Sequence, residues 1–144
     1  MIALVARKLR AGADVLRAAV AVTRARRTVR TSPIGGLVDS AAVLSHGEGR
    51  RLSASLRVSG ERWGAAVDRV LRWTPGDSAC LVRASALRDL LAQSGRPDAT
   101  VRIGVRRNTG GFEAHAWVEL DGTPIAEPVS LRGAFASLDG VTLR

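Results

Sequence analysis

The chain has 144 residues, enough for one domain with a single core, and its 46 % hydrophobic and 24 % charged residues exclude a disordered protein. One cysteine and two histidines exclude an internal disulfide framework and a multi-cysteine zinc site. The formal net charge is +9, but aromatic residues make up only 3 %, so a nucleic-acid surface would have few side chains for base stacking. We therefore expect no nucleic-acid partner.

Most of the charge lies in the first part of the chain. Residues 1–30 carry eight basic side chains and one acidic side chain, Asp14. No proline interrupts this segment, and apolar residues at helical spacing predict a basic helical arm over residues 1–31, with a stripe formed by Val5, Leu9, Leu16 and Val20. We expect the stripe to pack on the protein. Docking of an acidic partner, membrane-surface contact and nucleic-acid contact are the alternatives. The arm's apolar run is too short for an integral membrane segment.

A breaker cluster, Thr31–Gly36, ends the arm, and we place the remaining domain at residues 37–144. Short helices are expected before a better helix from about Glu61 to Trp73, which Thr74-Pro75-Gly76 ends. The apolar face of that helix is predicted to consist of Trp63, Ala66, Val67 and Val70.

A second helix is predicted over Ala79–Gln93, with Asp77 or Ser78 as its cap and Ser94-Gly95 after its end. The residues expected on its core side are Cys80, Ala84, Leu87 and Leu91. Three strands follow, at Thr100–Val105, Phe112–Leu120 and Pro124–Val129, joined by the turns Asn108–Gly111 and Asp121-Gly122. This order predicts an α+β fold in which N-terminal helices pack on one side of a small antiparallel sheet.

Cys80 is a candidate nucleophile because it lies in the first turn of its helix. Free backbone N–H groups and the positive end of the helix dipole favour a thiolate there, and the same N–H groups could hold an oxyanion. The alternative is a small buried side chain, which is the common fate of a free cysteine.

His115 is the candidate base, and it shares one strand face with Trp117 and Glu119. A histidine in the middle of a strand is otherwise a satisfied core or surface group. A cysteine at a helix start followed by a histidine on an adjacent strand is the arrangement of papain-like nucleophilic catalysis. The other histidine, His46, lies in a predicted loop and is given no role. No phosphate-binding loop, dinucleotide-binding motif or metal-spaced cluster occurs, so we expect no cofactor and no metal.

Four motifs in order carry a resemblance over roughly residues 62–128. They are Ala79-Cys80-Leu81-Val82-Arg83-Ala84-Ser85-Ala86-Leu87, then Leu90-Leu91 with Gly95, then Val101-Arg102-Ile103-Gly104-Val105-Arg106, then Ala114-His115-Ala116-Trp117-Val118-Glu119 with Asp121-Gly122 and Pro124. Together they resemble the transglutaminase-like leader peptidases of lasso-peptide biosynthesis.

The resemblance implies a papain/transglutaminase-like fold and a cytoplasmic cysteine peptidase that cuts the leader from a ribosomally made precursor peptide. It implies Cys80 as nucleophile and His115 as base. It places Glu127 where the family normally has an aspartate. The implied partners are the precursor, a small leader-recognition protein and an ATP-dependent macrolactam cyclase. A non-catalytic scaffold that presents the precursor to the cyclase, and an acyltransferase with the same triad, are the alternatives.

Asp121 competes with Glu127 for the third catalytic position, and the length of the hairpin loop bears on the choice. A two-residue loop would turn Glu127 away from His115, whereas a three-residue loop, Asp121–Thr123, would place both on one face. We therefore expect the three-residue loop, with Glu127 as the acid and Asp121 as a turn former. Trp117 and Arg83 are candidate substrate-binding residues. Trp117 could instead be buried under the hairpin, and Arg83 could be a solvated helix charge.

Overall fold

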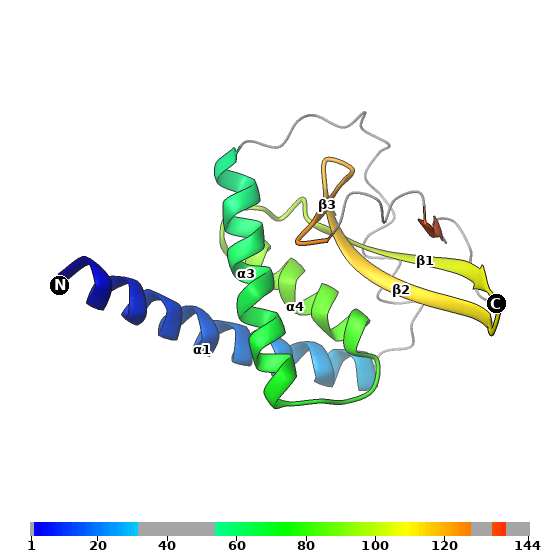
Figure 1. Cartoon of the computed structure of the whole chain (residues 1–144), viewed down its shortest axis with the longest axis horizontal. Coiled ribbons are helices and arrows are strands. Elements are labelled where there is room, and N and C mark those ends of the chain that lie inside the picture. The colour runs from blue at the N-terminus through cyan, green and yellow to red at the C-terminus, as the bar shows by residue number, and fades with distance from the viewer. Residues whose placement is uncertain (1, 32–53, 128–133, 138–144) are drawn as a thin grey trace.

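The computed structural model describes residues 2–31, 54–127 and 134–137. Its elements are α1 (Ile2–Thr31), α3 (Ala54–Trp73), α4 (Ala79–Gln93), β1 (Thr100–Asn108), β2 (Gly111–Leu120), β3 (Thr123–Ile125) and β4 (Ala136–Ser137). The strands form one antiparallel sheet in the order β3-β2-β1-β4. In Figure 1 the helices α3 and α4 lie beside each other, and α1 crosses both. The predicted α+β arrangement is confirmed.

Helix α4 has the bounds that the sequence predicted. It follows the Pro75-Gly76 turn and ends before Gly95, whose φ of 88° is a conformation that glycine adopts without strain. Helix α3 also ends where predicted, at Trp73, and its predicted apolar face is buried. It begins earlier than expected, at Ala54. Gly60 therefore lies inside the helix, where a Cβ would overlap the side chain of Ile125.

The prediction that α1 is a helix is confirmed, but the face predicted to pack is wrong. Leu9 and Leu16 are 70 % and 68 % exposed, and Val20 is also exposed. The buried face of α1 consists instead of small or medium side chains with one acid: Asp14, Ala18, Ala21, Val22 and Ala25. Short side chains let α1 approach α3 and α4 closely, which is why alanines rather than leucines form this contact.

The β2–β3 hairpin differs from the expected one. Leu120 pairs with Thr123, so the loop has two residues, Asp121 and Gly122, and the three-residue loop is wrong. Both loop residues have positive φ, 47° and 69°, as a type I′ turn requires. This turn matches the twist of the flanking strands, which explains why the shorter loop is preferred.

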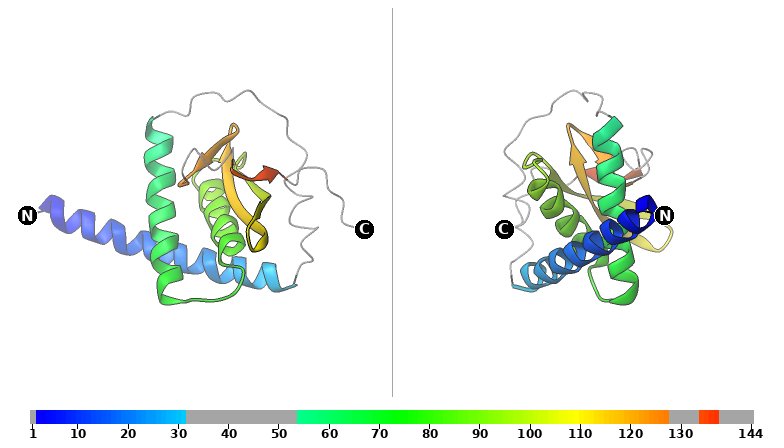
Figure 2. Two further views of the ribbon diagram at one scale, coloured as in Figure 1. Left: turned by 45° about the vertical axis from the view of Figure 1, so that its right-hand side comes forward. Right: turned by 90° about the vertical axis from the view of Figure 1, so that its left-hand side faces the viewer.

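Strand β3 ends at Ile125 rather than continuing toward Val129, because Ala126 adopts a left-handed conformation with φ 55°. The chain therefore leaves the sheet at this residue; residues 128 and 129 lie outside the described part. Strand β4, which the sequence did not predict, adds Ala136–Ser137 to the free edge of β1. Figure 2 shows this second edge of the sheet from two further directions.

The core lies between the three helices and one face of β2. The side chains of Ala116, Val118 and Leu120 point into it, together with Ile125 and the inner faces of α1, α3 and α4. His115 and Trp117 alternate with these residues and occupy the other face. Within the described residues, no helix is both long and apolar enough to cross a membrane. His46 and the short helices expected between residues 37 and 53 lie outside the described residues.

Candidate active site

Cys80 is the second residue of α4 and is half-buried against the core. The first helical hydrogen bond runs from the Val82 N–H to the Ser78 carbonyl, 3.0 Å, so the N–H groups of residues 79–81 have no intrahelical acceptor. The expected side-chain cap is wrong: Ser78 is the N-cap, but it has a left-handed φ of 57° and its side chain makes no capping hydrogen bond. The first turn thus presents the thiol beside backbone donors that the helix itself does not use.

The imidazole of His115 packs against two aromatic rings, Trp117 of β2 and Phe135 next to β4. Its centroid lies 6.2 Å from that of Trp117, with the planes 15° apart, and 5.5 Å from that of Phe135. Gly104, opposite His115 on β1, makes this cluster possible, since a Cβ there would lie 2.8 Å from both aromatic side chains. The packing restricts the ring's orientation on the face of the sheet that is turned away from the core.

Glu127 lies beside this ring. Its Oε1 is 3.8 Å from His115 Nε2, and its side chain is 12 % exposed. The Nε2 atom is buried and has no hydrogen-bond partner among the described residues. The left-handed Ala126 explains how Glu127 reaches His115 despite the two-residue hairpin: the strand's alternation stops before Glu127, so the expected rule that the shorter loop turns it away does not apply.

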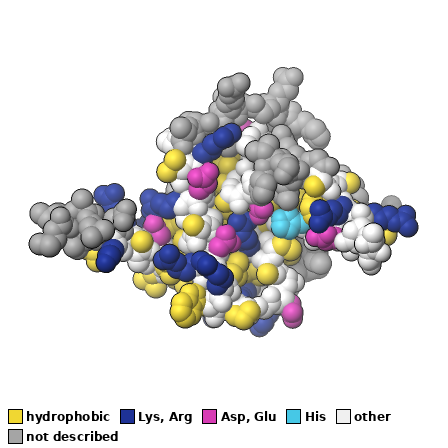
Figure 3. All heavy atoms as spheres, viewed as in Figure 1, with side chains coloured by type: hydrophobic (Ala, Val, Ile, Leu, Met, Phe, Trp, Pro, Cys, Tyr) yellow, Lys and Arg dark blue, Asp and Glu magenta, His cyan; other side chains and the backbone are white. Residues whose placement is uncertain are grey.

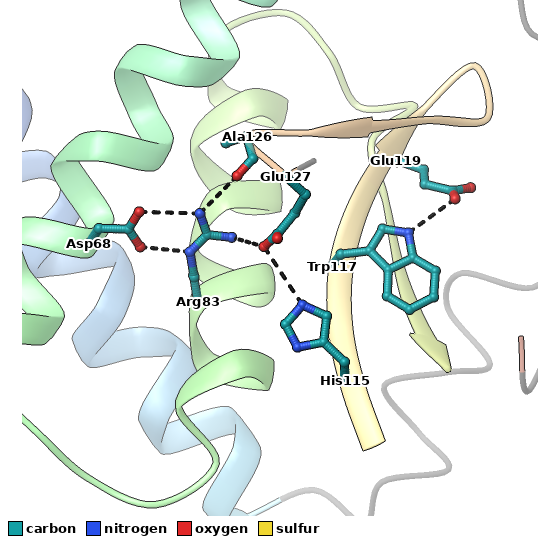
Figure 4. Close-up of polar contacts among 7 residues, drawn as sticks. All are labelled: Asp68, Arg83, His115, Trp117, Glu119, Ala126 and Glu127. Carbon is teal, nitrogen blue, oxygen red and sulfur yellow. Dashed lines mark hydrogen bonds and ion pairs between the residues drawn. The ribbon is translucent and has the colours of Figure 1, made fainter. Parts of the chain in front are cut away.

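Arg83 of α4 fixes the position of Glu127, as Figure 4 shows. Its guanidinium donates to Asp68 of α3 at 2.6 and 3.2 Å, to the Ala126 carbonyl at 3.0 Å, and to the Glu127 carboxylate. Burial alone would lower the pKa of Arg83, but the hydrogen bond to Asp68 and the charges of Glu127 and Asp68 outweigh burial and raise that pKa above its ordinary value. Arg83 is therefore a permanent cation shared between two carboxylates.

One face of α3 packs against the turn of the chain at Ala126, which we call the corner. Gly60, Gly64 and Asp68 recur every four residues, so they form one row along the helix. A Cβ on Gly64 would lie 2.5 Å from the Cβ of Ala126, so the missing side chain lets the corner sit directly on the helix. Our reading of the sequence missed this row and Asp68. Two glycines and an acid at four-residue spacing were the available signal.

The two other candidate residues, Trp117 and Arg83, have structural contacts of their own. Trp117 is 3 % exposed, and its indole N–H donates to Glu119 Oε1 at 3.0 Å. Arg83 is occupied by the chain's own carboxylates. Their roles in substrate contact stay predictions. Asp121 lies in the hairpin turn with its Oδ2 3.8 Å from an Arg96 guanidinium nitrogen.

The side chain of His115 is 27 % exposed, so part of the imidazole reaches the surface. In Figure 3 the cyan side chain is His115, since His46 lies outside the described residues, and acidic and basic side chains surround it. A groove of about 410 Å³ runs between α3 and β3 and reaches Arg83 and Glu127. Among the described residues no group of three His, Cys, Asp or Glu side chains could hold a metal ion.

The arrangement combines a thiol, an imidazole and a carboxylate on neighbouring elements. The described structure contains no hydrogen bond between Cys80 and His115; α4 and β2, which carry them, pack against each other. Catalytic hydrogen bonds are often long without substrate and tighten when it binds. An imidazole restrained by aromatic rings, with a carboxylate at one nitrogen, can act as a general base.

In the comparison with protein families, residues 2–139 match the model of the transglutaminase-like superfamily. Neither the search of curated proteins nor the search of solved structures found a significant match. The family match includes α1 and extends beyond β4, so it covers every element of the described fold. The chain therefore belongs to the transglutaminase-like superfamily.

Proposed function

We propose that the protein is a cysteine peptidase that removes the leader from a lasso-type precursor peptide. The observation that carries the proposal is the 3.8 Å approach of Glu127 Oε1 to His115 Nε2, on a sheet packed against the helix that has Cys80 in its first turn. Members of the superfamily are often cysteine peptidases or acyltransferases. The resemblance of residues 62–128 to lasso leader peptidases supplies the substrate class.

The position of Glu127 supports one assignment of roles to the two ring nitrogens of His115. Because Nε2 faces the carboxylate, a proton on Nε2 is stabilised there, and Nδ1 is left to accept a proton. Figure 4 shows the second ring nitrogen turned away from Glu127. In the proposed mechanism Nδ1 takes the proton of the Cys80 thiol, and Glu127 stabilises the resulting imidazolium.

The thiolate of Cys80 then attacks the carbonyl carbon of the peptide bond between leader and core. The Cys80 backbone N–H, free in the first turn of α4, donates to the oxyanion. Collapse of this intermediate breaks the C–N bond, and His115 returns its proton to the leaving amine. Water, deprotonated by His115, hydrolyses the thioester, which releases the carboxylic acid and restores the thiol.

The precursor peptide, a leader-recognition protein and an ATP-dependent macrolactam cyclase are the proposed partners. The test mixes the purified protein with precursor and leader-recognition protein and follows leader release by mass spectrometry. We expect release with the wild type and none with Cys80→Ala, and a pH–rate profile that loses its dependence on the imidazole in His115→Ala. Cleavage by Cys80→Ala would refute the proposal that Cys80 is the nucleophile.

Acyl transfer is a second candidate function, because the superfamily includes acyltransferases and the acyl-enzyme is common to both reactions. Adding a primary amine to the cleavage reaction separates them. A hydrolase gives the free acid, whereas a transferase gives the amide at amine concentrations far below that of water. A non-catalytic scaffold would instead show a Cys80 thiol that resists iodoacetamide near neutral pH.

A further inference from the structure

The outer face of α1 has the pattern of one half of a coiled coil. Leu9 and Leu16 are seven residues apart, and Ala13 and Val20 lie four residues after each of them. These four positions follow the heptad positions d and a, which form the seam between two helices. All four are exposed, on the side of α1 opposite the buried face. We call these four residues the outer seam.

A row of arginines follows the outer seam on one flank. Arg10, Arg17 and Arg24 each come one residue after a d position, so they occupy consecutive e positions. All three are exposed. The acid of the helix, Asp14, lies one turn from Arg10 and Arg17, but its side chain is buried and its carboxylate accepts hydrogen bonds of 2.7 and 2.6 Å from Arg62 of α3, so that charge is already paired.

We propose that the outer seam binds an amphipathic helix of another protein, with apolar residues facing the seam and Asp or Glu residues facing Arg10, Arg17 and Arg24. The apolar residues of the partner supply contact area, and its flanking acids supply the negative charge that complements the arginine row. The first half of α1 projects beyond α3 in Figure 1 and in the left view of Figure 2, so a partner helix has room to lie along it.

The charges disfavour a second copy of this chain as the occupant. Antiparallel pairing would set the arginine row against its own equivalent, because e positions then face e positions. Parallel pairing would set it against the g positions Gly12, Ala19 and Arg26, none of which is acidic.

The geometry also favours a helix over a membrane surface. A helix that lies in a membrane interface needs a wide apolar face, commonly with Trp or Phe. The outer seam is one side chain wide and contains no aromatic residue, and the opposite face of α1 is already packed against α3 and α4. A narrow seam of this kind accommodates one helix.

The experiment measures binding of two synthetic helical peptides to the full chain by fluorescence anisotropy. Both peptides carry leucine at every a and d position; one has Glu at e and g, and the other has Lys there. We expect saturable binding of the Glu peptide only, with an affinity that falls as salt is added. Equal binding of both peptides, or binding of neither, would overturn the proposal.

Variants then place the interaction on α1. Arg10→Glu together with Arg17→Glu should weaken binding of the Glu peptide at least about tenfold, because two attractions become repulsions. Leu9→Ser together with Leu16→Ser should weaken it by a similar factor through lost apolar contact. Arg107→Glu, at the exposed end of β1, is the matched control and should leave binding unchanged. Unchanged binding in both double variants would overturn the proposal.

Two further measurements test the other occupants. Wild-type protein that binds phosphatidylglycerol vesicles but not the Glu peptide would show a membrane-binding helix instead. A dimer that forms in sedimentation velocity and is lost in Leu16→Ser would show that a second copy covers the seam. Either result would overturn the assignment to an acidic partner helix, and a monomer without vesicle binding supports it.

Discussion

Glu127 faces two cationic groups, the guanidinium of Arg83 and the imidazole of His115 when it is protonated. The first contact is a hydrogen bond and the second is an ion pair at 3.8 Å. Arg83 thus holds the carboxylate in place, and the remaining distance to Nε2 is short enough to close with a small movement. In this arrangement the proposed catalytic acid depends on a residue that does not itself contact the reacting atoms.

Glu127→Gln tests the proposed role of the Glu127 carboxylate with a side chain of the same size. The amide keeps the shape but cannot stabilise an imidazolium, so we expect kcat for leader cleavage to fall by about a hundredfold or more. Asp121→Asn is the matched control, because it makes the same chemical change in the hairpin turn, where Asn is tolerated at positive φ. Equal losses in the two variants would contradict the assignment of Glu127.

Arg83→Gln should destabilise the fold. Removing the guanidinium leaves the 12 % exposed Glu127 without its hydrogen-bonded cation, so we expect the free energy of unfolding to fall by about 3 kcal/mol in a urea titration. Asp68→Asn removes the other partner of Arg83. Because the Asp68 side chain is 46 % exposed, its loss should cost about 1 kcal/mol or less. A larger effect of Asp68→Asn would show that the α3 contact, not Glu127, dominates.

At the scale of the elements, the α3 row and the corner at Ala126 determine where the acid lies. The corner directs the chain out of the sheet, and the glycines of α3 allow it to pack closely against that helix. Helix α4 contributes both the thiol and, through Arg83, the clamp on the carboxylate. Together with β2, which carries His115, the helices α3 and α4 and the segment after β3 therefore assemble the candidate site.

Gly64→Ala tests this convergence. The new methyl group would lie 2.5 Å from the Cβ of Ala126, which is attached to the backbone and cannot rotate away. We expect the free energy of unfolding to fall by about 1–3 kcal/mol and leader cleavage to slow, because the corner that carries Glu127 must shift. Gly12→Ala in α1 has open space around the new methyl and should stabilise the helix by about 0.5–1 kcal/mol. Stabilisation by both substitutions would contradict the close contact.

Over the whole molecule, the sequence predicted what local patterns determine. Pro75-Gly76 and Gly95 bracket α4, and Asp121-Gly122 marks the hairpin, so these elements could be found without tertiary information. The buried face of α1 could not, because close packing selects Ala18, Ala21 and Ala25 over the more hydrophobic Leu9 and Leu16. The strand β4 is two residues long and depends on contact with the distant β1, so it leaves no periodic signal of its own.

The candidate site was predictable in its residue types but not in its geometry. A lone cysteine at a helix start and a histidine on a strand are visible in the sequence. The approach of Glu127 to His115 depends on a left-handed alanine, which no residue preference favours, and on a clamp between Asp68 and Arg83, which are 15 residues apart. The expected loop length was wrong, yet Glu127 lies near His115 as expected. The corner at Ala126, and not the alternation of side chains along a strand, brings the carboxylate to the imidazole.

Acid sensitivity of the whole fold is a further prediction. The hydrogen bond from Arg96 holds the pKa of Asp98 below its ordinary value. Its folded pKa is therefore lower than its unfolded pKa, so the stabilisation is present above the unfolded value, about 4, and is lost as pH falls through the folded value. As the pH is lowered below about 4, we expect the urea concentration at the unfolding midpoint to decrease. The decrease should be less steep in Asp98→Asn. An identical slope in that variant would show that other carboxylates dominate.

The aromatic enclosure of His115 has a spectroscopic consequence. Ring currents from Trp117 and Phe135, whose centroids lie 6.2 and 5.5 Å from the imidazole, displace its proton resonances from their random-coil positions. The chain has two histidines, so the imidazole region of its proton NMR spectrum contains signals from only two side chains. The protonation of His115 can therefore be followed directly by NMR, in the unlabelled protein and without turnover.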